Sequence, residues 1–126
     1  FFNATLVSEE GNLIVDAGDF RVKVPSEKKS TYQSYVGKEI VFGIRPEHVH
    51  APEYAPPNIS PEPVVATVEV IELLGAELHL YLNSGRSSFV GTVDTRMMVN
   101  TGNKVDLVFD MNNMHLFDKE TERAIR

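Results

Sequence analysis

Short stretches in which apolar residues recur at every second position run through the whole chain, separated by Gly, Asn, Asp or Pro. In residues 20–24, for example, Phe20, Val22 and Val24 alternate with two cations, and Pro25 follows. A period of two is that of a β-strand, whose successive side chains point to opposite faces of a sheet. The sequence therefore predicts an all-β fold.

One segment fits a helix instead of a strand. Residues 27–36 follow Ser26, a candidate N-cap, and end before Gly37, which suits the left-handed position that closes a helix. The predicted strands are residues 2–8, 12–17, 20–24, 38–45, 64–74, 77–82, 88–93, 103–109 and 114–117. In the strand at 64–74, strict alternation would place Val68 and Val70 on the same face.

A proline-rich segment, residues 51–63, divides the chain. It holds five of the seven prolines, so it lacks backbone donors and favours an extended connector. We expect an OB-like N-terminal half at 1–50, the connector at 51–63 and a TOBE-like C-terminal half at 64–126. About five short strands in each half favour two intertwined OB-like barrels or one composite barrel.

Composition narrows the function. The net charge of −6, from 18 acidic and 12 basic residues, argues against nucleic acid or an anionic membrane as the main partner. The absence of cysteine excludes disulfides, thiolate metal sites and a cysteine nucleophile. No apolar run approaches the roughly 20 residues that span a bilayer. The chain opens on Phe1 without a Met, which leads us to expect a piece of a longer protein.

Residues 43–49, with the sequence Gly-Ile-Arg-Pro-Glu-His-Val, form the most informative motif. Pro46 has a φ suited to the first helical position and lacks an N–H, so it ends the preceding strand and can start a helical turn. Glu47 falls in that first turn, where its charge favours the exposed N–H groups. Arg45 and His48 flank these two residues. A buried Arg45 would need several carbonyl partners or a carboxylate, for which Glu47 and Glu77 are the candidates.

Two further motifs lie in the second half of the chain. Residues 68–77 read Val-Glu-Val-Ile-Glu-Leu-Leu-Gly-Ala-Glu, and residues 114–121 read Met-His-Leu-Phe-Asp-Lys-Glu-Thr. The residues of these motifs that we select as candidate site residues are Gly75, Glu77, Leu116, Phe117 and Asp118.

The three motifs resemble, in order, those of the C-terminal regulatory domain of ATP-binding subunits of carbohydrate ABC importers, the MalK-type family. The resemblance covers nearly the whole chain and implies an OB-like/TOBE β-barrel architecture with one short helix and two intertwined halves. The family usually has Gly after the position of Thr121, where this chain has Glu122. A glycine there supplies a left-handed turn residue, so Glu122 implies local strain or a differently shaped turn.

The resemblance implies a non-catalytic regulatory and dimerisation domain. The chain has no Gly-x-x-x-x-Gly-Lys-Ser/Thr phosphate loop, so we expect no catalytic residues or cofactor here, with ATP and magnesium bound by a preceding domain. The expected partners are a second copy of the subunit, permease subunits reached through that domain, and a phosphotransferase-type regulatory protein. We expect a cytoplasmic location at the inner face of the membrane. In this role Arg45, Pro46, Glu47 and His48 are structural or interfacial.

Other kinds of site fit these residues less well. Glu47, His48, His50 and Glu53 are the densest group of metal-type ligands, but Pro46 interrupts the strand geometry that would align them, so we expect no metal site. The phenylalanines at 20, 42, 89, 109 and 117 are predicted to be core rather than a base-stacking platform. The tyrosines at 32, 35 and 54 are predicted to be exposed contacts.

An anion- or small-ligand-sensing TOBE barrel stays open as the alternative function. Such a site needs several convergent donors. Residues 84–88, Ser-Gly-Arg-Ser-Ser, form the densest cluster of donors in the chain, and they equally suit a hairpin loop.

Overall fold

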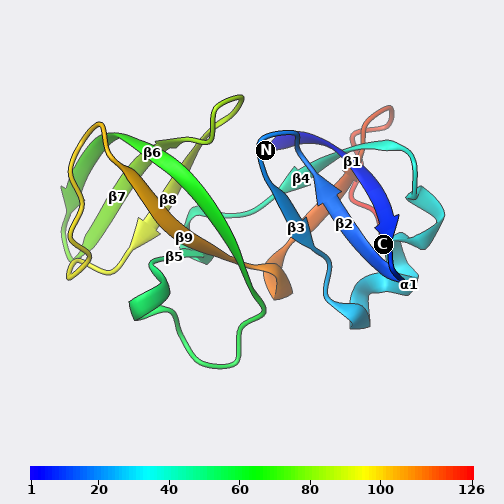
Figure 1. Ribbon diagram of the computed structural model, residues 1–126, viewed down its shortest axis with the longest axis horizontal. Coiled ribbons are helices and arrows are strands. Elements are labelled where there is room, and N and C mark those ends of the chain that lie inside the picture. The colour runs from blue at the N-terminus through cyan, green and yellow to red at the C-terminus, as the bar shows by residue number, and fades with distance from the viewer.

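The computed structural model describes all 126 residues and contains two five-stranded antiparallel sheets that lie side by side (Figure 1). The first sheet has the order β10-β4-β1-β2-β3, and the second has the order β5-β9-β6-β7-β8. The first consists of β1 (Phe2–Glu9), β2 (Asn12–Asp16), β3 (Arg21–Lys23), β4 (Glu39–Gly43) and β10 (His115–Asp118). The second consists of β5 (Val49–His50), β6 (Pro61–Leu74), β7 (Glu77–Asn83), β8 (Ser88–Val93) and β9 (Lys104–Asp110). The all-β prediction is confirmed.

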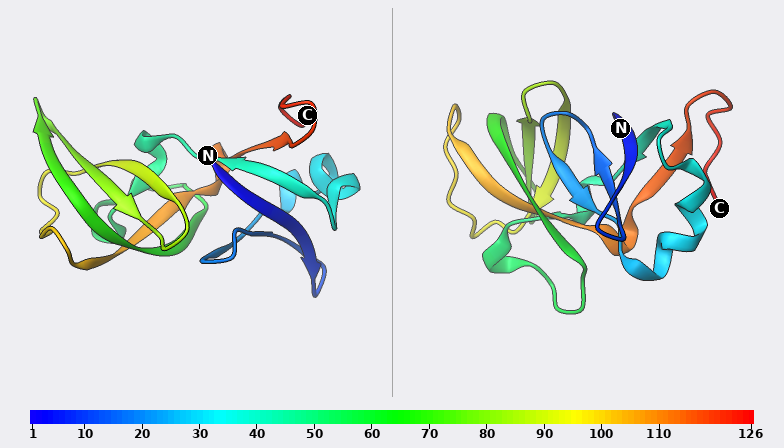
Figure 2. Two further views of the ribbon diagram at one scale, coloured as in Figure 1. Left: turned by 90° about the horizontal axis from the view of Figure 1, so that it is seen from above. Right: turned by 45° about the vertical axis from the view of Figure 1, so that its right-hand side comes forward.

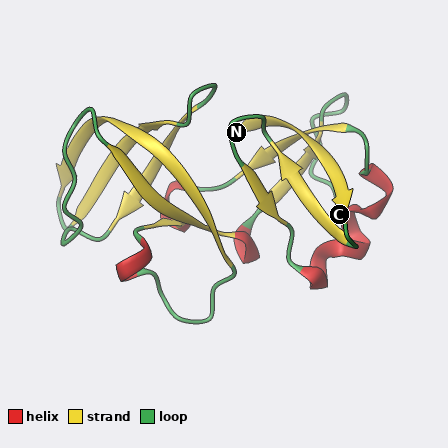
Figure 3. Ribbon diagram, in the orientation of Figure 1, coloured by secondary structure: helices red, strands yellow, loops and turns green.

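Helical structure is confined to short turns at the ends of strands (Figure 3). The predicted helix at 27–36 is three successive pieces, η1 (Ser26–Lys28), α1 (Lys29–Tyr32) and η2 (Gln33–Tyr35). Ser26 does not cap it, because Ser26 lies inside η1 and its hydroxyl donates to the Glu27 carboxylate at 3.3 Å. The remaining 3₁₀ turns are η3 (Pro46–His48), η4 (Pro52–Tyr54) and η5 (Met111–Asn113).

The β1–β2 hairpin shows how local sequence sets the register. Glu9 pairs with Asn12, which leaves a two-residue loop of Glu10 and Gly11. Both have positive φ, 51° and 82°. Two-residue hairpin loops favour this conformation because its twist matches that of the strands.

Each sheet takes a strand from the other half of the chain. β10 returns from the second half to pair with β4, and β5 leaves the first half to pair with β9 (Figure 2). The structure is thus intertwined as the fold prediction states. The domain boundaries at 1–50, 51–63 and 64–126 stay a prediction, and strand pairings connect the two halves in both directions.

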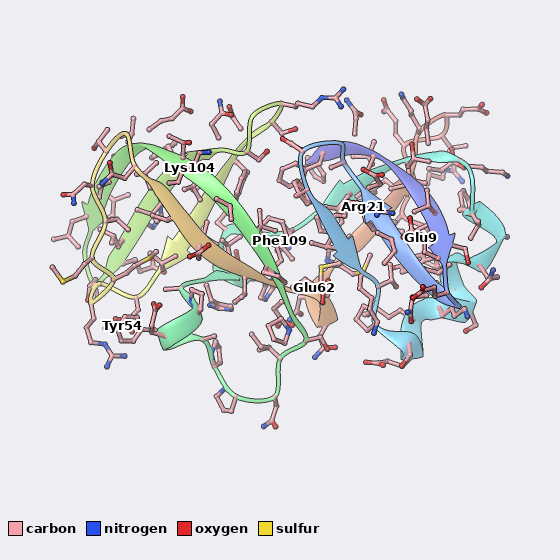
Figure 4. All side chains as sticks on the ribbon, in the orientation of Figure 1. Glu9, Arg21, Tyr54, Glu62, Lys104 and Phe109 are labelled. Carbon is pink, nitrogen blue, oxygen red and sulfur yellow. The ribbon has the colours of Figure 1, made fainter.

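One hydrophobic core joins the two sheets. At its centre Phe2 lies 5.0 Å from Phe20 and 5.3 Å from Phe89, measured between ring centroids. Phe109, labelled in Figure 4, is 5.6 Å from Phe89 and 6.0 Å from Phe42. The prediction that these phenylalanines are core is therefore confirmed, although Phe117 is only half-buried at the rim.

The tyrosine prediction is wrong in one case. Tyr32 is buried, with 6% of its surface exposed, because the helical segment lays its ring on the core. Burial raises the pKa of this tyrosine. Tyr35 and Tyr54 are half-buried, and the Arg96 guanidinium lies 4.3 Å from the centre of the Tyr54 ring.

A bulge in β6 overturns the predicted alternation of that strand. The register with β7 shifts between Val68 and Val70. Val68 pairs with Leu82 and Val70 pairs with the next residue, Tyr81, so β6 has one extra residue at this point. Val68 is fully buried whereas 49% of Val70 is exposed. A β-bulge inserts one residue and rotates the rest of the strand, and here it turns Val70 outward and Ile71 toward the core.

The final turn allows a test of the Glu122 prediction. Glu122 has a φ of 62°, in the left-handed region, and its N–H donates to the Asp118 carbonyl at 2.8 Å. Since glycine adopts this φ without a Cβ penalty, Glu122→Gly is expected to be neutral or to raise the free energy of unfolding by up to about 1 kcal/mol.

Urea denaturation of both proteins measures this change, with Glu120→Gly as the matched control. Glu120 lies in the same turn without positive φ, so glycine there is expected to cost about 0.5–1 kcal/mol through the entropy of the unfolded chain. A clear loss of stability in Glu122→Gly would mean that the Glu122 side chain makes a contact that outweighs the strain.

Candidate functional site

A pocket of about 420 Å³ lies where the two sheets meet, and we call it the inter-sheet pocket. Its walls come from the end of β4 and the start of η3, from β8, from β10 and from the first residue of the chain. The lining residues are Phe1, Gly43, Ile44, Arg45, Pro46, Phe89, Val90, His115 and Phe117. The pocket therefore brings together residues of the first and third sequence motifs.

Gly43 allows the aromatic wall to close on the backbone. A Cβ at this position would lie 3.1 Å from ring atoms of both Phe1 and Phe117, closer than ordinary van der Waals contact. Gly43 also pairs with His115 across the β4–β10 ladder. The absence of a side chain at position 43 thus sets how near these rings approach the strand.

The turn after β4 follows the sequence prediction. Arg45 has extended dihedrals and Pro46 occupies the first position of η3, where the His48 N–H donates to the Arg45 carbonyl at 2.9 Å. Glu47 lies in the first turn and is exposed. η3 packs against β8, which fixes Pro46 at the edge of the pocket.

Arg45 is exposed at the rim of the pocket and makes no side-chain hydrogen bond or ion pair. The carboxylate partner that a buried Arg45 would require, Glu47 or Glu77, is therefore not present. Exposure removes the need for it, because water solvates the guanidinium.

Glu77 and Gly75 lie elsewhere, in the hairpin that joins β6 to β7 (Figure 1). Gly75 has a φ of 63° and serves the turn. The Glu77 carboxylate is 3.7 Å from Nε2 of His79. The second sequence motif is therefore separate from the inter-sheet pocket.

The third motif divides between the core and the last turn. Leu116 is buried and Phe117 lines the pocket. Asp118 accepts hydrogen bonds from the Thr121 and Glu120 N–H groups and from the Tyr35 hydroxyl at 3.0 Å. These donors lower the pKa of Asp118, so it holds the turn as a carboxylate.

The donor-rich loop at 84–88 faces a carboxylate of the same chain. Oδ2 of Asp19, in the β2–β3 turn, accepts the Ser84 hydroxyl at 2.6 Å and the Arg86 N–H at 2.9 Å. Donors that could hold a free oxyanion are thus engaged in a contact between the sheets.

The metal-type side chains of Glu47, His48, His50 and Glu53 do not form a cluster. The structure has no group of three or more His, Asp or Glu side chains arranged to hold a metal ion. His48 Nδ1 is buried without a hydrogen-bond partner. Burial lowers the pKa of His50, against a raising influence of Asp110 and with a further lowering influence of His48.

Asp110 was missed by the sequence analysis. It is 4% exposed and accepts hydrogen bonds from Ser60 N at 3.2 Å, Asn112 N at 3.0 Å and Asn113 Nδ2 at 2.7 Å. It stands where the chain leaves β9 for β10. An Asp with Asn two and three positions later, between two strands, is a turn signature that could have identified it.

Two five-stranded sheets, each of which includes a strand from the other half of the chain, pack around one core with a pocket at their junction. This arrangement defines a β-barrel domain of the OB and TOBE class. The family described as "MalK OB fold domain" matches this chain at residues 1–49, and the family described as "TOBE domain" matches it at residues 42–117. The chain belongs to the TOBE domain family, and the resemblance to MalK-type proteins is confirmed.

Two relatives with similar sequences carry the names of sugar-import ATP-binding proteins. The chain is 39% identical to the trehalose/maltose import ATP-binding protein MalK of Thermococcus litoralis, over 98% of this chain and 34% of that protein. It is 34% identical to the oligosaccharides import ATP-binding protein MsmX of Bacillus subtilis, over 90% of this chain and 32% of that protein. The chain therefore spans about a third of the length of these relatives.

A solved structure supports the fold. The crystal structure of the cytoplasmic molybdate-binding protein ModG, with molybdate bound, superposes with a TM-score of 0.61 and 17% identity, covering 91% of this chain and 90% of that one. At this identity the likeness shows the fold alone.

None of the helices of this chain is long and apolar enough to cross a membrane.

Proposed function

We propose that this chain is a non-catalytic regulatory and dimerisation domain of the ATP-binding subunit of a sugar ABC importer. Nearly the whole chain matches about one third of each of two sugar-import ATP-binding proteins, which supports this role. ATP and magnesium would be bound by the two thirds that the chain does not cover, which would also dock on the permeases. The subunit would lie in the cytoplasm against the inner membrane face, and a phosphotransferase-type protein is a further candidate partner.

The observation that carries the dimerisation proposal is an exposed apolar surface on β6 and β7, which we call the hairpin face. It comprises Val65, Val70, Leu74 and Tyr81 on the outer side of the sheet. The bulge in β6 contributes to it by turning Val70 outward. Exposed apolar patches of this kind mark sites of association.

The charges around the hairpin face suit a two-fold contact. Glu72 and Glu77 lie toward the end of the hairpin, while Lys104 on β9 stands opposite Thr67, further back along β6. A two-fold axis across the face would bring the acidic end of one copy toward Lys104 of the other. Glu72 raises the pKa of the Tyr81 phenol by hydrogen bonding, which keeps that hydroxyl a donor.

Sedimentation over a wide concentration range should show a reversible monomer–dimer equilibrium. We expect a dissociation constant around micromolar or weaker. The contact must persist while the ATP-binding domains open and close without preventing that motion, and tethering in the whole complex adds the remaining affinity. Leu74→Lys places a cation within the apolar contact and is expected to weaken the dimer by about tenfold or more.

Met98→Lys is the matched control, since Met98 is 94% exposed on the β8–β9 loop, outside the hairpin face. It should leave the equilibrium unchanged. A strict monomer at millimolar concentration would rule out dimerisation by this domain, and equal effects of the two substitutions would place the contact elsewhere.

A further inference from the structure

The inter-sheet pocket differs in charge from four other pockets of the molecule. Four others of about 240–430 Å³ each contain at least two carboxylates among their lining residues. The inter-sheet pocket contains none, and its two ionisable side chains are Arg45 and His115. In a chain of net charge −6 this leaves an unpaired cation over a carboxylate-free surface.

The walls of the pocket are mainly apolar. Phe89, Phe117 and Ile44 supply hydrophobic surface from β8, β10 and the end of β4. Because Phe89 belongs to the shared core and Gly43 is held in the β4–β10 ladder, the pocket is largely formed before any ligand arrives. Ligand sites typically combine such an apolar cavity of about 300–1,000 Å³ with a few polar groups that fix orientation.

We propose that the inter-sheet pocket binds a small amphipathic anion, with a flat apolar body against the aromatic wall and one carboxylate at the Arg45 guanidinium. A guanidinium presents a fork of N–H donors that matches a carboxylate, and stacked or apolar contacts hold the remainder of the ligand. Residues of both sheets line the site, so the ligand bridges them and stabilises the folded chain by mass action. This proposal goes beyond the regulatory and dimerisation role and does not depend on it.

The test compares two probes of nearly identical shape, indole-3-acetate and its neutral amide, indole-3-acetamide. Titration of the 126-residue chain followed by NMR should give saturable shifts for indole-3-acetate, centred on residues 43–46, 89–90 and 115–117. The amide should bind at least about tenfold more weakly than the acetate, since it lacks the charge that the guanidinium recognises.

Variants separate the charge from the cavity. Arg45→Gln should weaken indole-3-acetate binding about tenfold and leave the amide unchanged. Arg123→Gln, which removes an exposed arginine outside the pocket, should change neither. Val90→Trp enlarges the side chain of a residue that lines the pocket and should weaken the binding of both probes, while thermal melting checks that the variant is folded.

Equal affinity for the acetate and the amide, or equal effects of the two arginine substitutions, would overturn the proposal. So would shifts centred on the β6–β7 hairpin instead of the pocket, or the absence of saturation at millimolar probe. Sedimentation of the chain without ligand tests dimerisation separately, so failure of one proposal is distinguishable from failure of the other.

Discussion

Replacing Phe109 by alanine is expected to lower the free energy of unfolding by about 3–5 kcal/mol. Phe109 is fully buried, and its ring contacts rings from both sheets. Its aromatic neighbours are Phe2, Phe20, Phe42 and Phe89. Alanine would remove this contact area and leave a cavity that the surrounding strands can fill only in part. A total stability of roughly 5–15 kcal/mol makes this a large loss.

Urea denaturation followed by both circular dichroism and tyrosine fluorescence measures the effect. Phe117→Ala is the control, because Phe117 is half-buried at the rim and should cost clearly less. The shared core also predicts a single transition with both probes. Two separate transitions would show that the sheets are stabilised independently. A loss below about 1 kcal/mol for Phe109→Ala would show that this ring is not central to the core.

Asp110→Ala is expected to cost about 2–3 kcal/mol, although Asp110 is a polar residue. Its buried carboxylate accepts three hydrogen bonds, two from backbone N–H groups and one from the Asn113 amide. Alanine removes the acceptor of these three donors, two of which belong to the half-buried residues Ser60 and Asn112. An unsatisfied buried donor carries most of its desolvation penalty into the folded state.

Asp110→Asn separates the contributions of these bonds. The asparagine carbonyl can still accept from Ser60 N and Asn112 N, which both contact Oδ1, whereas an amide NH₂ would face the Asn113 amide as a second donor. Thermal and urea denaturation should therefore place Asp110→Asn between the wild type and Asp110→Ala. If Asp110→Ala costs less than about 0.5 kcal/mol, water reaches the donors and Asp110 does not hold the turn.

The alternation of apolar residues was sufficient to predict most strands, because the side-chain period of a strand is a local property. It predicted Ser88–Val93 without error. At Glu122 the family resemblance left open either local strain or a differently shaped turn, and the φ of 62° is that of the left-handed, strained alternative. The turn at Pro46 followed equally from local chemistry, since proline has one favoured φ and no N–H.

Tertiary features escaped the same reasoning. Alternation states which face a residue occupies but not which strand lies beside it, so the pairing of β10 with β4 could not be deduced. The bulge between Val68 and Val70 has no glycine to signal it. The inter-sheet pocket depends on both strand pairing and sheet packing, and it joins residues near positions 44, 89 and 116 that no local pattern connects.

The pairing of β10 with β4 has a consequence for synthesis. Gly43 and Phe42 emerge from the ribosome well before their partners His115 and Leu116, which lie more than seventy positions further along the chain. Until then β4 presents an unpaired row of backbone donors and acceptors, and such an edge readily pairs with other chains. The first sheet must therefore wait for the synthesis of β10 to complete itself, and nascent or prematurely terminated chains carry the open edge on which aggregation can begin.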